Sequence, residues 1–181
     1  MAACPQTKGL SVLEHGWQVR DYFNDLIAHL EHGTVLIYEW RLPEWASPAI
    51  LIYLSDLERL NTYQLYHDCG KPFCIEFDEQ GRQHFPDHAA VSAKVAREHG
   101  FSESICTLIE KDMQIHLLKD VGVAAFCDDP DAISLLLTGL AEIHANAAMF
   151  GGIESVSFKQ KWKQINRRGK KIVNTVINKS G

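Results

Sequence analysis

The side chains best suited to chemistry begin with an adjacent pair, His67 and Asp68, followed by Lys71. Imidazole nitrogens and carboxylate oxygens both bind divalent cations. Two neighbours at a helix end can face one ion only if further ligands come from elsewhere in the chain. A compact cation such as Lys71 can neutralise phosphate charge as it develops. These residues predict a metal centre that acts on phosphate, with Asp68 and Lys71 as its catalytic residues.

Further metal-competent side chains fall on the apolar faces of expected helices. Each recurs in phase with aliphatic residues at helical spacing, so each is expected to point inward. An unpaired charge in such a place is costly, and one divalent cation would offset that cost for all of them together. Such an ion also lowers the pKa of bound water from 15.7 to about 7 and polarises a phosphoryl oxygen. The residues are His15, His88, Asp112 and Glu142.

The middle of the chain resembles the HD-domain phosphohydrolase superfamily, and in its motifs most closely the HD domains of tRNA CCA-adding enzymes. The resemblance lies in residues 67–72, the turn at 78–82, His84-Phe85, His88 and Ser92-Ala93. Residues 11–15 resemble that superfamily's first ligand helix, so the likeness spans about residues 11–150. It implies an all-α helical bundle that hydrolyses phosphomonoesters or phosphodiesters, often of nucleotides or RNA ends.

The resemblance also implies roles for individual residues. By matching positions, His15, His67 and Asp68 are ligands of a first metal ion, and His88 is a ligand in the members that hold two. His84 is expected to face the substrate, with metal or plain surface as alternatives. We therefore expect one or two divalent ions, drawn from Mn, Mg, Co, Ni or Fe.

The chain departs from the superfamily's pattern at two positions. Asp112 stands where relatives often carry histidine, and Glu142 stands where they end with aspartate. Both changes supply oxygen ligands, which favours harder ions such as Mn²⁺ or Mg²⁺. Asp120 is an alternative to Glu142 as the last ligand. The departures also favour a second hypothesis, a nucleotide or nucleic-acid binding module that keeps the fold without catalysis.

The elements that must position these residues are mostly helical. Apolar residues at spacings of three, four and seven, with capping residues at the ends, predict the helices, and alternation around a turn predicts a small β-hairpin near residues 73–85. Residues 34–42 have strand propensity, with a buried helix segment as the alternative. Helices are expected over residues 11–30, 49–54, 56–66, 87–100, 102–118, 130–150 and 158–178, the last with a break at Gly169.

Composition fits a globular protein with one main domain, expected at residues 1–157 and followed by a C-terminal helix at 158–181. The chain is 46% hydrophobic and 23% charged. It shows neither a secretory pattern nor a run of about 18 apolar residues, so we expect a cytoplasmic protein without membrane contact. Five cysteines without a CxxC pair argue against a disulfide framework or a thiolate zinc site.

The charge is divided along the sequence. Residues from Lys159 onward carry +8 with no acid, and the rest of the chain carries −13. Such a run is a solvated helix face, a path for RNA or DNA with Trp162 available for stacking, or a site for anionic substrate groups. The expected partners are thus a nucleotide or other phosphate-ester substrate, and RNA or DNA at the basic helix. The sequence leaves the oligomeric state open.

Overall fold

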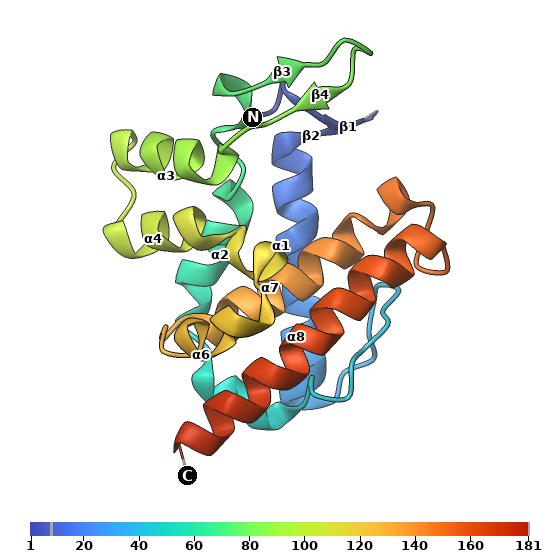
Figure 1. The fold of residues 1–181 in the computed structure, drawn as a ribbon, viewed down its shortest axis with the longest axis vertical. Coiled ribbons are helices and arrows are strands. Elements are labelled where there is room, and N and C mark those ends of the chain that lie inside the picture. The colour runs from blue at the N-terminus through green and yellow to red at the C-terminus, as the bar shows by residue number, and fades with distance from the viewer. Residues whose placement is uncertain (8, 181) are drawn as a thin grey trace.

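The computed structural model describes residues 1–7 and 9–180, so Lys8 and Gly181 of the two expected ranges lie outside the described residues. The described residues are 63% helical, and Figure 1 shows a body of helices with two small antiparallel hairpins at one end. This confirms an all-α class with a hairpin between residues 73 and 85. The α-helices are α1 Val12–His32, α2 Leu57–Tyr66, α3 His88–Glu98, α4 Glu103–Lys111, α5 Gln114–Leu117, α6 Val123–Phe126, α7 Ala132–Ala145 and α8 Val156–Ser180.

The shorter elements join these helices. Strands β1 Pro5–Thr7 and β2 Leu10–Ser11 form one hairpin, and β3 Glu76–Phe77 and β4 Gln83–His84 form the other. Four 3-10 turns lie at Pro48–Tyr53, Lys71–Phe73, Asp120–Gly122 and Ala147–Phe150. The first hairpin and the short helix α6 were not expected from the sequence.

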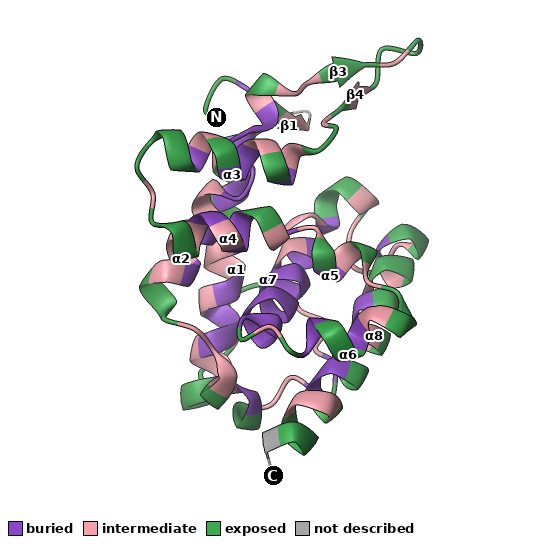
Figure 2. Ribbon diagram, turned by 60° about the vertical axis from the view of Figure 1, so that its left-hand side comes forward, coloured by how far each residue is buried: buried purple, intermediate pink, exposed green. Residues whose placement is uncertain are grey.

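Helix α7 is the centre of the core. Its segment 132–141 is buried on every side, which is typical of a helix that is apolar all round. Helices α1 and α8 pack against it, α2 packs on α1, and Figure 2 shows the buried residues concentrated along α1 and α7. Phe158, Ile165 and Ile172 bring the apolar face of α8 into the same core. None of the helices in the described part of the chain is long and apolar enough to cross a membrane.

Helix α1 begins and ends as the sequence predicts. The Ser11 side chain accepts a hydrogen bond from the Glu14 backbone, and the Glu14 side chain accepts one from the Ser11 backbone, forming a capping box. Gly33 ends the helix with a positive φ of 67°, a conformation that glycine adopts without strain. This firm start fixes the first turn of α1, where His15 lies.

The segment 34–42 is neither the strand nor the buried helix that its composition favours. It forms an irregular loop held by the buried carboxylate of Asp25, which accepts hydrogen bonds from the Ile37 and Tyr38 backbone and the Trp40 ring. Strand propensity needs a partner strand to satisfy the backbone, and here a carboxylate does so instead. Ile37 consequently lies 82% exposed.

Two helices differ from their expected course. The helix expected over 102–118 is interrupted between α4 and α5, where Asp112 turns inward and is only 3% exposed. Helix α8 runs without a break at Gly169. A Cβ atom there would lie 2.3 Å from the Trp45 ring, so this glycine serves close packing rather than helix termination.

A buried ion pair joins α2 to the start of α7. Arg59 Nη2 donates to Asp131 Oδ2 at 2.7 Å, and the Ser55 hydroxyl donates to Asp131 Oδ1. Burial raises the pKa of Asp131, but the hydrogen bonds and charge of Arg59 outweigh it and hold that pKa below its usual value. The ionised carboxylate therefore stabilises the fold above the pH at which the unfolded chain titrates.

We expect Asp131→Asn to lower the unfolding free energy by about 2 kcal/mol at neutral pH, because a charged hydrogen-bonding partner of Arg59 is lost. The deficit should be constant above about pH 4 and shrink as the pH falls through the lowered pKa, since the wild-type carboxyl is then protonated too. Urea titrations across pH measure this. Asp128→Asn, which disrupts an exposed pair with Lys179, should change stability little at any pH; equal losses in both variants would contradict the prediction.

Candidate metal centre

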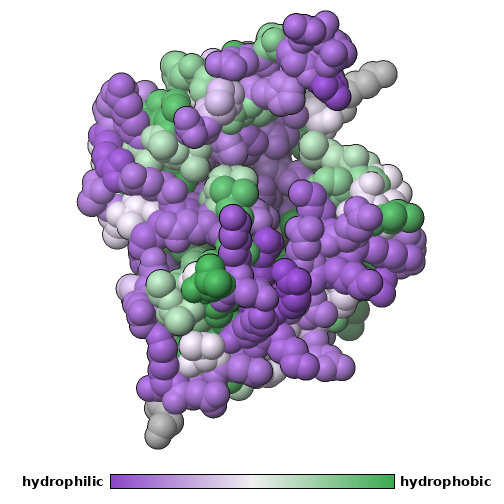
Figure 3. Space-filling model, in the orientation of Figure 1, coloured by the Kyte–Doolittle hydropathy of each residue, from purple (hydrophilic) through white to green (hydrophobic). Residues whose placement is uncertain are grey.

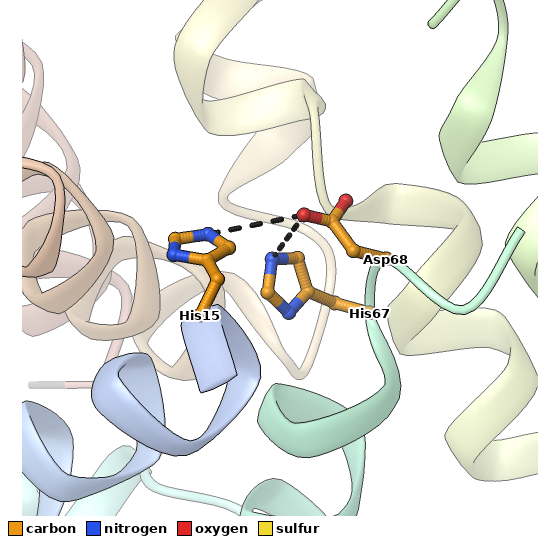
Figure 4. Close-up of side chains that lie close together, drawn as sticks. All are labelled: His15, His67 and Asp68. Carbon is orange, nitrogen blue, oxygen red and sulfur yellow. Dashed lines mark ion pairs between the residues drawn. The ribbon is translucent and has the colours of Figure 1, made fainter. Parts of the chain in front are cut away.

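Three of the predicted ligands meet in the interior. His15 lies on the first turn of α1, His67 follows the last residue of α2, and Asp68 is next to it; all three are at most 1% exposed. One ligand atom from each lies within 4.8 Å of the others. Figure 4 shows both imidazoles turned toward the Asp68 carboxylate. His15 and His67, which are far apart in the sequence, are thus brought together in the fold.

Hydrogen bonding sets the orientation of this cluster, and several of its buried atoms have no partner among the described residues. His67 Nδ1 lies 2.7 Å from the Gln64 carbonyl oxygen, which accepts its proton and turns Nε2 toward Asp68 Oδ2 at 3.2 Å. Neither ring nitrogen of His15 has a hydrogen-bond partner among the described residues, and Asp68 Oδ1 has none. Buried polar atoms are rarely left in this state, so these are atoms that a ligand would satisfy.

The electrostatics of the cluster favour a positive charge at its centre. Burial lowers the pKa of His15 to about 4. Burial also disfavours the charged form of His67, but the carboxylates of Asp68 and Asp112 outweigh it and raise the pKa of His67 to about 10. Despite its burial, the pKa of Asp68 lies well below its ordinary value because His67 and Lys71 flank it. The carboxylate is therefore ionised and surrounded by groups that attract or carry positive charge.

The donor set fits a divalent cation. Nitrogen and oxygen ligands lie about 2.0–2.2 Å from ions such as Zn²⁺, so two ligands of one ion are at most about 4.4 Å apart. The spacing of up to 4.8 Å in the cluster needs only a small contraction to meet this limit. Two imidazoles and one carboxylate also match the ligands that such ions prefer. The cluster could hold a metal ion.

His88 and Lys71 lie against the other sides of Asp68. His88 Nε2, on the first turn of α3, is 3.6 Å from Asp68 Oδ1. Lys71 Nζ donates to Asp68 Oδ2 at 2.6 Å and to the Gln6 side chain at 3.0 Å. The predicted catalytic lysine is thus in direct contact with the predicted catalytic aspartate.

Asp112 and Glu142 border the cluster without touching its ligand atoms. Tyr63 donates to Asp112 Oδ1, and Asp112 Oδ2 is buried without a hydrogen-bond partner. Glu142 pairs with His116 at 2.7 Å. Both carboxylates raise the pKa of His67, which places them in its electrostatic surroundings. They supply negative charge and remain candidate ligands.

Asp120 and His84 lie elsewhere. Asp120 is on the surface and pairs with Lys171 at 2.7 Å, so the structure places Glu142, not Asp120, beside the cluster. The side chain of His84 is 58% exposed on the hairpin and lies 3.1 Å from Asp78 Oδ2. The structure thus gives His84 a hairpin partner and not a position among the ligands, and its substrate role stays a prediction.

Sequence reasoning missed two residues that touch the site. Tyr63 lies four positions before His67, on the same inward face of α2, and this spacing was the available signal. Gln6 reaches Lys71 from the unexpected N-terminal hairpin, so no local pattern could have found it. His144, two positions after Glu142, accepts from the Arg41 backbone and lies next to the Leu140 carbonyl.

Two glycines allow the elements of the site to meet. A Cβ atom at Gly16 would lie 2.3 Å from the Leu65 carbonyl oxygen, so α1 and α2 touch backbone to backbone beside His15 and His67. A Cβ atom at Gly70 would lie 2.3 Å from the Ser92 backbone nitrogen, where α3 approaches. Only glycine permits such close approach. The placement of the candidate ligands therefore depends on Gly16 and Gly70, which supply no ligand atoms themselves.

Comparison with models of protein families, with curated protein sequences and with solved structures gives no match to this chain.

We expect Gly16→Ala to push α1 away from α2 and to separate His15 from His67. The unfolding free energy should fall by about 1–3 kcal/mol, as in other overpacked interiors, and Mn²⁺ affinity should fall by about tenfold or more. Calorimetric titration of the folded protein with Mn²⁺ measures this. Gly122→Ala, whose new methyl group meets only the flexible end of Leu118, is the matched control and should behave as wild type. Unchanged affinity in Gly16→Ala would show that this contact does not set the site.

Proposed function

We propose that this chain is a divalent-metal-dependent phosphohydrolase of the HD-domain type, cleaving a phosphomonoester or phosphodiester of a nucleotide or an RNA end. The observation that carries the proposal is the buried meeting of His15, His67 and Asp68, where both His15 nitrogens, His67 Nε2 and Asp68 Oδ1 have no hydrogen-bond partner in the described chain. The motif resemblance around residues 67–92 supports the same assignment.

His15, His67 and Asp68 would hold the ion, with His88 and Asp112 as further ligands. A divalent cation in this position supplies Lewis acidity, which makes water a stronger nucleophile at neutral pH and draws charge from a phosphoryl oxygen. Gln64 fixes the ring of His67 by accepting from Nδ1, and Tyr63 fixes the Asp112 carboxylate. These contacts keep the ligand atoms in place, as the partners of metal ligands commonly do.

The substrate would approach the less buried side of the cluster. The side chains of His88, His116 and Glu142 are 16–21% exposed, whereas those of His15 and Asp68 are at most 2% exposed. Glu142 and His116, which pair at 2.7 Å, would add a polar, partly exposed edge to this approach. Lys71 supplies a second cation, which neutralises charge on the phosphate in the transition state.

We expect Asp68→Asn to abolish bound metal and to reduce hydrolysis of phosphate esters by at least about a thousandfold, since one charged ligand is lost while the side-chain shape is kept. Elemental analysis and a panel of nucleotides, short RNAs and p-nitrophenyl esters, each with added Mn²⁺, Mg²⁺, Co²⁺ or Ni²⁺, measure the two effects. Asp21→Asn, on the surface of α1, is the control. Full activity and metal content in Asp68→Asn would disprove the proposal, and metal binding without turnover in wild type would favour the non-catalytic binding module.

Lys71→Gln should separate metal binding from catalysis. The ammonium group neutralises Asp68 from 2.6 Å, so its loss should leave Mn²⁺ affinity equal or tighter. The same loss removes positive charge from the developing phosphate, so kcat should fall by about a hundredfold. Metal titration and steady-state kinetics on the best ester of the panel test both. A parallel fall in metal affinity would show that Lys71 only maintains the site.

A further inference from the structure

A cleft of about 690 Å³ lies between α8 and the loop at residues 41–45, and none of its lining residues belongs to the metal centre. Figure 1 shows that loop, in light blue, running beside α8. Two tryptophans fix its walls: Trp162 Nε1 donates to the Arg41 carbonyl at 2.6 Å, and Trp45 Nε1 donates to Asn166. The cleft is therefore built by specific contacts that hold its aromatic rings in place.

One wall presents a stacked guanidinium group. The Arg41 guanidinium carbon lies 4.9 Å from the centre of the Trp162 ring, and the arginine side chain is 41% exposed. Among the described residues, its one ion pair is a loose one of 3.7 Å with Glu154, which is itself 74% exposed and also pairs with Lys159. A guanidinium plane held over an indole with its outer face open is a surface on which nucleobases stack.

The helix flank beside this wall carries free positive charge. Lys163 and Lys170 are exposed, seven residues apart and hence on one side of α8. Neither makes an ion pair within the described ranges, and Lys161 on another side of the helix makes none either, whereas Lys159, Lys171 and Lys179 are each paired with an acid. Seen from the side of Figure 1, the surface along α8 is hydrophilic (Figure 3). Glu44 is the one acid that lines the cleft.

We infer that this cleft binds a single strand of nucleic acid. A base stacked on Arg41 places its edge near the amide groups of Asn166 and Asn174, which line the same cleft and can donate to and accept from base edges. Lys163 and Lys170 would contact the phosphates on either side of this base. A stacking surface, amide groups and Lys170 in one groove, with Lys163 on the same side of α8, are features that binding of a single strand requires. The inference does not rest on the proposed hydrolysis, because the cleft and the metal centre share no residue.

Fluorescence anisotropy with labelled twelve-residue oligouridylate and oligothymidylate tests the inference in the full chain, with EDTA present. Wild type should bind, and its log affinity should fall linearly with log salt at a slope of about −0.7 for each phosphate contacted. Lys163→Gln/Lys170→Gln should bind about tenfold more weakly or worse and should flatten the slope by about 1.4, the share of two phosphates. Lys94→Gln/Lys179→Gln removes the same charge elsewhere and should change affinity less than about twofold.

Arg41→Lys tests stacking separately from charge, because it keeps the positive charge and removes the planar group. We expect a severalfold loss of affinity with an unchanged salt slope. Asp68→Asn should bind the strand as wild type does, so failure of the metal-centre proposal leaves this result intact. The inference is overturned if both lysine pairs weaken binding equally, or if poly-glutamate displaces the strand at equal charge concentration, which would make the cleft a site for acidic polypeptides.

Discussion

The central constraint in this structure is that two imidazoles and a carboxylate are buried together, and several of their polar atoms have no hydrogen-bond partner among the described residues. An ionised carboxylate in an apolar interior is costly unless it is paired. Asp68 meets this need with His67 and Lys71, whose positive charges stabilise its ionised form. The same arrangement leaves both nitrogens of His15 unsatisfied. Burying polar atoms without partners costs stability, and one cation bound between them would satisfy several of these atoms at once.

The surrounding helices determine where His15, His67 and Asp68 lie. His15 comes from the start of α1, so the Ser11 capping box and the contact of Gly16 with the Leu65 carbonyl decide where its ring lies. The apolar helix α7 is the element on which α1 packs, and it also carries Glu142 to the edge of the cluster. The ligands are thus fixed by packing far more than by hydrogen bonds to one another. Rigid elements of this kind hold a site more accurately than loops do.

Much of this could be predicted from the sequence where the signal is local. Helical phase placed His15 on an inward face and predicted a helix over residues 11–30, close to the observed bounds of α1. The segment 34–42 could not be predicted, because its backbone is satisfied by Asp25, a residue from another element. Tertiary contacts of that kind override propensity. The contact of Gln6 with Lys71 could not be predicted for the same reason, since the hairpin and this hydrogen bond form only in the folded chain.

The division of charge along the sequence has a spatial counterpart. The carboxylates of the metal centre lie inside, among α1, α2 and α7, while the basic residues of α8 line its outer face. Where α8 meets acids, as at Asp120 and Glu154, individual lysines are neutralised. Among the described lysines of α8 that have no ion pair, Lys170 lines the cleft beside the Arg41 and Trp162 wall, and Lys163 lies on the same side of the helix. Unpaired positive charge next to an ordered aromatic surface favours contact with a polyanion, at a place separate from the buried cluster of His15, His67 and Asp68.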